Sequence, residues 1–354
     1  GTIDTATNSV FGTAVTITAN TNSLTSVTGA GLGALADNGG TVMTRNIESG
    51  SVLINAGDNA SAAALATDAN GNNRISFGKV DVGATEFTGP FVVDEAGDTV
   101  DGDISAGHLS LREAVALANT NADVSTITFD ASLAGQTITL TGGELVLTQD
   151  VTIDGDTDGD HKADITISGN NASRVFRMTG ASTDVDLLSL TLTNGYSNGD
   201  GGAVYASSIG TLDIQDTTIS DSSARWGGGL NVRGTDVTLA NSLVTGNTAN
   251  YGGGIYAWSL STLTVTNSTI HGNTANSSGG GISAGISTVT LVNSTVTGNQ
   301  ADADGSVTTD GGGIYNFIST ITVINSVVAE NTSGTLMTAN DVSGTIDTAD
   351  HSFF

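Results

Sequence analysis

The sequence predicts an all-β protein, a right-handed parallel β-helix (solenoid) with roughly 25–26 residues per coil and one short capping α-helix. Three observations lead to this prediction. A motif recurs at a nearly constant spacing, Val, Ile or Leu alternates with Thr in short runs, and Gly and Asn separate these runs. Alternation at period two is typical of strands with one buried face, and Gly and Asn are typical of turns.

The recurring motif is clearest after Asp186, where its central aliphatic residues are spaced by 25, 26, 26 and 32 residues. They are Ile219, Val244, Ile270, Val296 and Val328. Three residues before each stands Asp216, Asn241, Asn267, Asn293 or Asn325. Three residues after each stands Ser222, Asn247, Asn273, Asn299 or Asn331. The longest spacing contains an inserted loop around Asp302–Asp310.

Each repeat is long enough for three short strands but too short for a βαβ unit. Coils of a parallel β-helix stack about 4.8 Å apart, so side chains at one position of every coil form a column. We therefore predict structural ladders at Asp216 and at the eight Asn positions named above. The nearest alternative, a β-propeller, needs about 40–50 residues per blade. A β-sandwich leaves the in-register Asn unexplained, and regular alternation argues against disorder.

Composition narrows the function classes. The 36 acidic and nine basic residues give a formal net charge of −27, which argues against a nucleic-acid partner because phosphate binding requires clustered Lys and Arg. An excess of carboxylates favours divalent cations. Cysteine is absent, so disulfide and thiolate chemistry are excluded, and no apolar run is long enough for membrane insertion by this segment.

The two ends of the sequence repeat each other. Residues 344–354, GTIDTADHSFF, match residues 1–11, GTIDTATNSVF, at eight of eleven positions without gaps. A fixed long offset indicates one period of a tandem array. We expect the partners to be neighbouring copies of the same repeat, end to end. The repetition favours one polypeptide and leaves separate docked subunits as the alternative.

Two further stretches carry a family resemblance. HLSLREAVALAN (His108–Asn119) resembles the Cys-Ser-Leu-Arg-Glu-Ala domain that opens large bacterial surface β-helix proteins, with Leu109 in place of the Cys. Leu32–Asp58 and Thr67–Phe87 look like the choice-of-anchor segment that closes such β-helices. The resemblance implies a pectin-lyase-like β-helix in a giant secreted, adhesin-like protein on the bacterial cell surface, and it implies no particular ligand.

The closing element precedes the opening element, so the sequence is offset from its own domain boundaries. We expect residues 1–90 to be the C-terminal coils and closing segment of a preceding β-helix. Residues 91–126 are then a junction and opening segment, and residues 127–354 the main β-helix. Ser110 and Glu113 are spaced as a capping box at the start of a short helix through Asn119. Its apolar side is expected to plug the first coil.

The strongest candidate for a ligand site is IDGDTDGDHKAD. Its alternating carboxylates resemble half of a calcium loop, since Ca²⁺ takes six to eight oxygen ligands. The predicted calcium ligands are Asp154, Asp156, Asp158, Asp160 and Asp164, with Asp98, Asp101 and Asp103 as a weaker second set. Position twelve, where a calcium loop has Glu, is Ile165, so a solvated acidic turn remains the alternative. We expect the calcium to be structural.

Catalysis is not expected. A polysaccharide lyase needs a Lys or Arg base, and no basic residue follows Arg233, so the most regular coils contain none. Asp216 and Asp221 are the nearest approach to a hydrolase pair, but Asp216 occupies a ladder position. The four His residues show no metal-ligand spacing.

Aromatic residues near the Gly turns of successive coils form a second candidate surface, for a glycan or for lateral contact. They are Trp226, Tyr251, Tyr256, Trp258 and Tyr315. Ordinary packing between coils is the alternative. The sequence thus predicts a structural, non-catalytic repeat that builds an adhesin stalk, extracellular filament or surface coat, with polysaccharide binding or cleavage as the competing function.

Overall fold

The computed structural model describes residues 2–12, 16–24, 27, 29–121, 124–305 and 311–354. The chain divides into two compact units. The first contains residues 1–95 and 99–128, and the second contains residues 96–98 and 129–354. Part of the inserted loop predicted around Asp302–Asp310, residues 306–310, lies outside the described residues.

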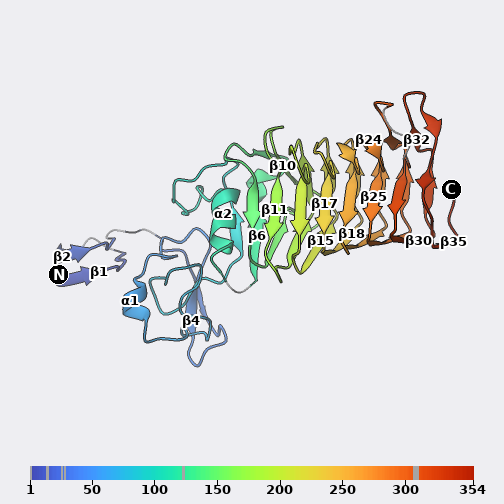
Figure 1. Cartoon of the computed structure of the whole chain (residues 1–354). Coiled ribbons are helices and arrows are strands. Elements are labelled where there is room, and N and C mark those ends of the chain that lie inside the picture. Colours follow the sequence, from blue (N-terminus) through green and yellow to red (C-terminus); the bar gives the residue numbers. More distant parts are fainter. Residues whose placement is uncertain (1, 13–15, 25–26, 28, 122–123, 306–310) are drawn as a thin grey trace. The chain divides into compact units, whose positions relative to one another are not determined.

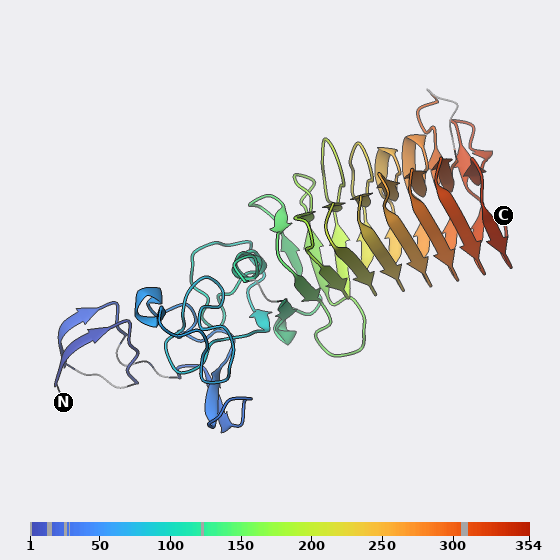
Figure 2. The ribbon, with the colours of Figure 1, turned by 60° about the horizontal axis from the view of Figure 1, so that its bottom comes forward.

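The second unit is a stack of strands that belong to four sheets (Figures 1 and 2). Strands of neighbouring coils pair in parallel, and the strands Thr332–Ser333 and Thr338–Ala339 of one coil pair antiparallel at the end of the fourth sheet. Sheets 1 and 2 each contain eight strands. Sheet 1 comprises β7 (Thr137–Thr139), β10 (Ile165–Ser168), β13 (Leu190–Thr193), β16 (Thr218–Ser220), β19 (Leu243–Thr245), β23 (Thr269–His271), β27 (Thr295–Thr297) and β31 (Val327–Ala329). Sheet 2 comprises β8 (Leu145–Leu147), β11 (Phe176–Thr179), β14 (Val204–Ser207), β17 (Leu230–Arg233), β21 (Ile255–Trp258), β25 (Ile282–Gly285), β29 (Ile314–Phe317) and β34 (Val342–Ser343).

Sheets 3 and 4 complete the coils. The strands of sheet 3 that lie wholly in the second unit are β9 (Val151–Asp154), β12 (Val185–Leu188), β15 (Thr211–Gln215), β18 (Asp236–Ala240), β22 (Thr262–Thr266), β26 (Thr288–Val292), β30 (Thr320–Ile324) and β35 (Thr348–Asp350). Sheet 4 contains β20 (Thr248–Tyr251), β24 (Thr274–Ser278), β28 (Gln300–Ala301), β32 (Thr332–Ser333) and β33 (Thr338–Ala339). A 3₁₀ turn, η1 (Ala131–Leu133), precedes the first coil.

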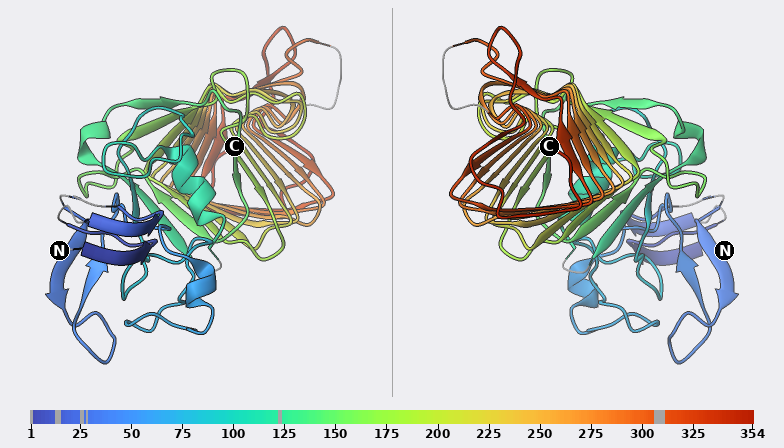
Figure 3. Two further views of the ribbon diagram at one scale, coloured as in Figure 1. Left: turned by 90° about the vertical axis from the view of Figure 1, so that its left-hand side faces the viewer. Right: turned by 90° about the vertical axis from the view of Figure 1, so that its right-hand side faces the viewer.

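The core consists of aliphatic columns, that is, residues at the same position of successive coils. In sheet 1, Ile219 pairs with Val244, Val244 with Ile270, Ile270 with Val296, and Val296 with Val328. All five are fully buried. Seen end-on, the coils superimpose around this shared interior (Figure 3). The predicted column and the parallel solenoid are therefore confirmed.

The first unit combines short strands with long irregular segments. Its elements are β1 (Thr2–Thr7), β2 (Thr16–Thr21), β3 (Leu32–Ala36), β4 (Thr44–Ile47), α1 (Asn59–Ala62), β5 (Phe91–Val93), α2 (Leu111–Ala118) and β6 (Ser125–Phe129), the last ending one residue into the second unit. β1 pairs in parallel with β2, and β3 pairs antiparallel with β4. Phe77, Phe87 and Phe91 form an aromatic cluster with ring centroids 4.6–5.9 Å apart.

Helix α2 has the predicted capping box. The Ser110 hydroxyl accepts from Glu113 N (3.2 Å), and the Glu113 carboxylate accepts from Ser110 N (3.3 Å). The apolar side of α2, including Leu111, Val115 and Ala118, is buried. Its role as a plug of the β-helix stays a prediction. Among the described residues, no helix combines the length and hydropathy needed to cross a bilayer.

Candidate functional site

An asparagine ladder runs through the interior of the second unit. Asn247, Asn273, Asn299 and Asn331 occupy the same position of four successive coils and are fully buried. The Oδ1 atom of Asn299 accepts from both N (3.0 Å) and Nδ2 (2.9 Å) of Asn273. The Nδ2 atom of Asn273 also donates to the carbonyl of Val244 (2.9 Å). Each amide therefore satisfies backbone groups of two coils at once, in a region that water does not reach.

The ladder ends on a carboxylate at the C-terminal end of the stack. Asn331 donates from N (2.8 Å) and Nδ2 (2.9 Å) to Oδ1 of Asp341, which takes the place of the next amide. At the other end, Ser222 N donates to Oδ1 of Asn247 (3.0 Å). Ser222 thus begins the column that the sequence motif predicts.

The second predicted ladder has a different role. Asp216 is half-buried, whereas Asn241, Asn267, Asn293 and Asn325 are exposed, and all five have left-handed backbone with φ of 48° to 52°. Between neighbours of this column, Asn267 Nδ2 donates to Asn241 Oδ1 at 3.4 Å. These residues therefore form turns and not a buried amide ladder. Asn and Asp suit them because their short polar side chains tolerate this conformation.

A buried hydroxyl ladder lies beside these turns, and the sequence analysis missed it. Its members are Thr217, Ser242, Ser268, Ser294 and Ser326. Each serine hydroxyl accepts from the backbone N–H of the hydroxyl residue one coil earlier, for example Ser242 N to Ser268 Oγ (3.0 Å). The same hydroxyl donates to a carbonyl two residues before it, as Ser268 Oγ does to Thr266 O (2.8 Å). The recurring Asn-Ser dipeptide was the available signal.

The acidic loop after β9 brings together three of its five candidate ligands. Carboxylate oxygens of Asp156, Asp158 and Asp164 all lie within 4.8 Å of one another. Asp154 accepts from Asp156 N (3.0 Å), and Asp160 forms an ion pair with Lys162, so both shape the loop. Oxygen ligands from alternate positions of one turn suit a hard cation such as Ca²⁺.

The loop carboxylates are already held by backbone amides. Asp156 accepts from Gly159 N (2.7 Å) and His161 N (2.9 Å), and Asp164 accepts from Thr157 N (3.0 Å). The hydrogen bonds from backbone N–H groups to Asp156 hold the pKa of its carboxyl below the usual value, although partial burial opposes this. Backbone N–H groups therefore hold the Asp156 and Asp164 carboxylates in place. Ile165, at position twelve, is buried in β10 and supplies no ligand.

The weaker calcium set does not converge among the described residues. Asp98 accepts from Thr141 N (2.6 Å) and Gly142 N (2.7 Å). Asp101 accepts from Asp103 N (2.8 Å), and Asp103 accepts from the following Ser105. These carboxylates stabilise turns.

The five predicted aromatic residues line one groove of about 520 Å³, together with Phe317, which the sequence analysis missed. Tyr256 and Trp258 stack in parallel at 5.3 Å between ring centroids, and Trp258 stacks on Phe317 at 5.8 Å. Gly285 occupies the position between Trp258 and Phe317 in this column, because its backbone pairs with Trp258 on one side and with Phe317 on the other. A Cβ at Gly285 would lie 1.9 Å from the Trp258 ring.

Two arginines border this groove. The Arg225 guanidinium lies 4.2 Å from the centroid of the Trp226 ring. Arg233 lies 5.8 Å from the rings of both Trp226 and Tyr256, and it pairs with Asp200 at 2.7 Å. The groove therefore combines flat aromatic faces with cationic groups, in a chain that is otherwise strongly acidic.

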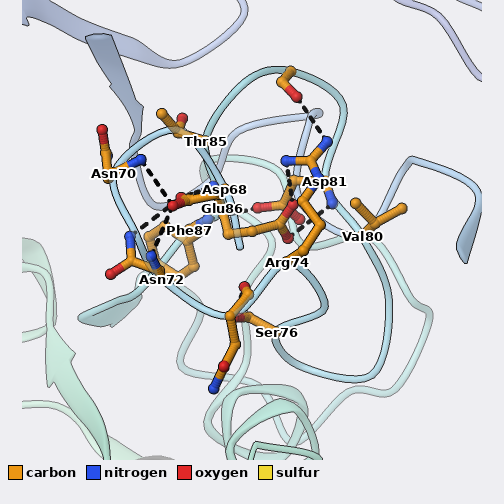
Figure 4. A network of polar contacts seen from close by, with 12 residues as sticks. Asp68, Asn70, Asn72, Arg74, Ser76, Val80, Asp81, Thr85, Glu86 and Phe87 are labelled. Atoms are coloured by element: carbon orange, nitrogen blue, oxygen red, sulfur yellow. Dashed lines mark hydrogen bonds and ion pairs between the residues drawn. The ribbon is translucent and has the colours of Figure 1, made fainter. Parts of the chain in front are cut away.

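The first unit contains a buried ionic network that the sequence analysis also missed (Figure 4). Arg74 reaches Glu86 at 2.8 Å and donates to the carbonyl of Gly83 at 2.9 Å. Asp68 accepts from Asn72 N (2.8 Å) and from Glu86 N (2.8 Å). These residues come from one irregular segment, 67–87, and no period in the sequence relates them.

Asp81 completes the network by accepting from Asn55 N and Phe87 N, both at 2.6 Å. Burial raises the pKa of Asp81 to about 6. Burial, and then the neighbouring Asp81 carboxylate, raise the pKa of Glu86 to about 7 although Arg74 opposes the shift. The acids join distant parts of a segment with little regular structure, so the network has a structural role.

Comparison with known proteins supports the fold. Residues 176–348 match the family model described as "Right handed beta helix region". The second unit is therefore a right-handed parallel β-helix. Neither the curated proteins nor the solved structures contain a match to this chain. The resemblance of the segments before residue 176 to opening and anchor domains stays a prediction.

Proposed function

We propose that this chain is a structural, non-catalytic tandem repeat of a giant secreted bacterial cell-surface protein, which builds an adhesin stalk, extracellular filament or surface coat. The observation that carries the proposal is the stack of parallel coils with in-register columns. Backbone pairing between neighbouring coils, with buried ladders beside it, is the arrangement of a stiff rod. The net charge of −27 opposes lateral association between rods.

The size of the source protein tests this proposal. An antibody raised against the chain should detect, on an immunoblot of the source cells, a polypeptide several times larger than 35.2 kDa. Protease added to intact cells should remove that band, because the protein is exposed outside the cell. A protease-resistant band near 35 kDa would contradict both the array and the location.

Calcium is the proposed structural ligand of the acidic loop, with Asp156, Asp158 and Asp164 as the central ligands and Asp154 and Asp160 beside them. At about a hundredfold excess over its dissociation constant, an ion that binds only the folded state stabilises it by roughly 2–3 kcal/mol. We expect calcium to raise Tm by about 5–10 °C relative to EDTA, as measured by circular dichroism.

A conservative substitution separates the effect of the bound ion on Tm from the effect of the loop structure itself. Asp158→Asn should abolish the calcium-dependent shift in Tm without disturbing the loop, because Asp158 is exposed and an amide oxygen can accept from Asp160 N as the carboxylate does. Asp103→Asn, in the set that does not converge, is the matched control and should retain the shift. Equal shifts in both variants would exclude calcium binding at this loop.

The aromatic groove favours a second function, the binding of a polysaccharide. Stacked rings offer faces to sugar rings, and the adjacent arginines favour acidic sugars. We expect Trp258→Ala to weaken binding of acidic oligosaccharides at least tenfold in calorimetric titrations, about 1.4 kcal/mol. Gly285→Ala should do the same by displacing the Trp258 ring.

Tyr196→Ala is the control for these variants, because Tyr196 is exposed and does not line the groove. It should leave the affinity unchanged. Equal affinity in Trp258→Ala and the unmodified protein would remove the groove as a glycan site. Turnover of the oligosaccharides would instead favour a polysaccharide-cleaving enzyme.

A further inference from the structure

The C-terminal coil of the β-helix, residues 345–354, leaves one edge without a neighbour among the described residues; we name it the terminal rung. β35 is the last strand of sheet 3, with Thr348 opposite Thr322 and Ala349 opposite Val323. After β35, Phe353 forms a bridge with Val327. Phe353 and Phe354 are 65% and 45% exposed, so the end of the stack presents aromatic surface beside open backbone groups.

The terminal rung belongs to the repeating pattern of the helix. His351 has φ 49°, as the exposed Asn column has, and it stands at the corresponding turn. Ser352 Oγ accepts from Ser326 N at 3.3 Å, which extends the hydroxyl ladder by one coil. The coil therefore ends in the same local structure as the coils before it, and nothing in its geometry terminates the stack.

The same rung occurs again at residues 2–11, which we name the leading rung. It has the same order: β1, then Asn8 with φ 44°, then Ser9 and Val10. The sequence offset of 343 places Thr5 at Thr348, Ala6 at Ala349 and Ser9 at Ser352. The leading rung, however, has a neighbour on the side where the terminal rung has none.

That neighbour is the coil of β2. Thr5 pairs with Ala19 and Ala6 with Asn20 in parallel register, and Val10 forms a bridge with Leu24. Ser9 N donates to Ser23 Oγ at 3.0 Å, in the same direction as every step of the hydroxyl ladder. The terminal rung is paired with the coil that precedes it in the chain, and the leading rung is paired with the coil that follows it.

We propose that the open edge of β35 pairs in parallel with β2 of a second copy of this sequence, with Thr348 opposite the partner's Ala19 and Ala349 opposite the partner's Asn20. Ser352 N donates to Oγ of the partner's Ser23, so the hydroxyl ladder continues from one copy into the next. In this junction residues 345–354 replace the partner's leading rung. The inference rests on the proposed tandem array and gives it a register.

A two-copy chain tests the register. Residues 12–354 follow Phe354 directly, so that the first copy stays complete and the second begins where its leading rung would end. Because the chain has no Cys, Ala349→Cys in the first copy and Asn20→Cys in the second introduce the only thiols. Residues directly opposite in a sheet are close enough to bridge. We expect a disulfide on oxidation, mapped by mass spectrometry.

The matched control shifts the register by one residue. Ala349→Cys with Ala19→Cys should form the disulfide at least tenfold more slowly, because successive side chains of a strand point to opposite faces. A second readout needs no substitution. The amides of Ser352 and Phe354, whose counterparts Ser9 and Phe11 donate to Ser23 Oγ and Leu24 O, should exchange with deuterium at least a hundredfold more slowly in the two-copy chain than in the single chain. Absence of this protection, or faster bridging by the shifted pair, overturns the junction.

The outcome for the junction is separable from that for the proposed function. If the two-copy chain has about twice the length by small-angle scattering but shows neither the disulfide nor protection, the rod stands and the junction falls. If the junction forms but the source protein migrates near 35 kDa, the chain is not an array, and the junction joins separate subunits.

Discussion

Replacing Asn299 with alanine is expected to destabilise the β-helix by about 3–5 kcal/mol. The substitution removes donors to the carbonyls of Ile270 (2.9 Å) and Thr297 (3.1 Å). It also removes the acceptor that Asn273 uses for N and Nδ2. Each buried group left without a partner costs about 1–3 kcal/mol, and a small cavity adds to the loss. Asn299 is fully buried, so bulk water does not reach the groups that lose their partners.

Urea unfolding followed by circular dichroism measures this loss. Asn293→Gly is the matched control, because Asn293 is exposed and its φ of 51° is one that glycine adopts without strain. It should change the free energy of unfolding by less than about 1 kcal/mol. If the two substitutions destabilise equally, the buried ladder is not a major source of stability in this fold.

The contrast between these two asparagines shows what a sequence period can predict. Both columns recur at the same spacing, so the sequence predicted that each would be in register. It did not predict that Asn299 would be buried and Asn293 exposed, since both are Asn beside a turn. The difference arises from backbone conformation: Asn293 takes the left-handed turn itself, whereas Asn299 follows Gly298, which takes it with φ 64°. The Asn of the Gly–Asn dipeptide therefore points into the coil interior, whereas the Asn of the Asn–Ser dipeptide is exposed to solvent.

Unlike the hydroxyl ladder, the ionic network of the first unit has no period in the sequence from which it could have been predicted. Arg74 meets Glu86 through an irregular segment, and Asp81 reaches Asn55 across 26 residues of chain. Phe317 joins the aromatic groove because β29 places it in the same column as Trp258, although an inserted loop separates their coils in sequence. Such contacts depend on the path of loops, which a single sequence does not determine.

The acidic loop is an intermediate case. Alternating residues of one turn were predicted to converge, and the oxygens of Asp156 and Asp158 do so. Asp164 joins them because the chain returns to enter β10 at Ile165. Asp160 turns outward to Lys162 instead. The sequence spacing predicted which carboxylates lie in the same loop, and the path of the turn determines which of their oxygens come close enough to share a cation.

Replacing Gly253 is expected to have the other large effect, because the backbone of the next coil lies directly against it. A Cβ on Gly253 would lie 2.5 Å from the carbonyl oxygens of both Gly280 and Thr274. Both are backbone atoms of the next coil, so they move only if the coils separate. We expect Gly253→Ala to cost about 3 kcal/mol or more, at the upper end of overpacking substitutions, and to lower Tm by about 6–12 °C.

Gly272→Asn distinguishes steric exclusion from a general intolerance of substitution. Gly272 has φ 64°, which Asn tolerates, and the nearest atom to its Cβ position is Thr245 Oγ1 at 3.8 Å. This variant should unfold within about 3 °C of the unmodified protein in the same thermal melts, a change of less than about 1 kcal/mol. If Gly253→Ala also melts within about 3 °C of the unmodified protein, the coils can separate locally at little cost in free energy. The stack would then be too compliant to act as a rod, because a position in close backbone contact with the next coil would accept a methyl group.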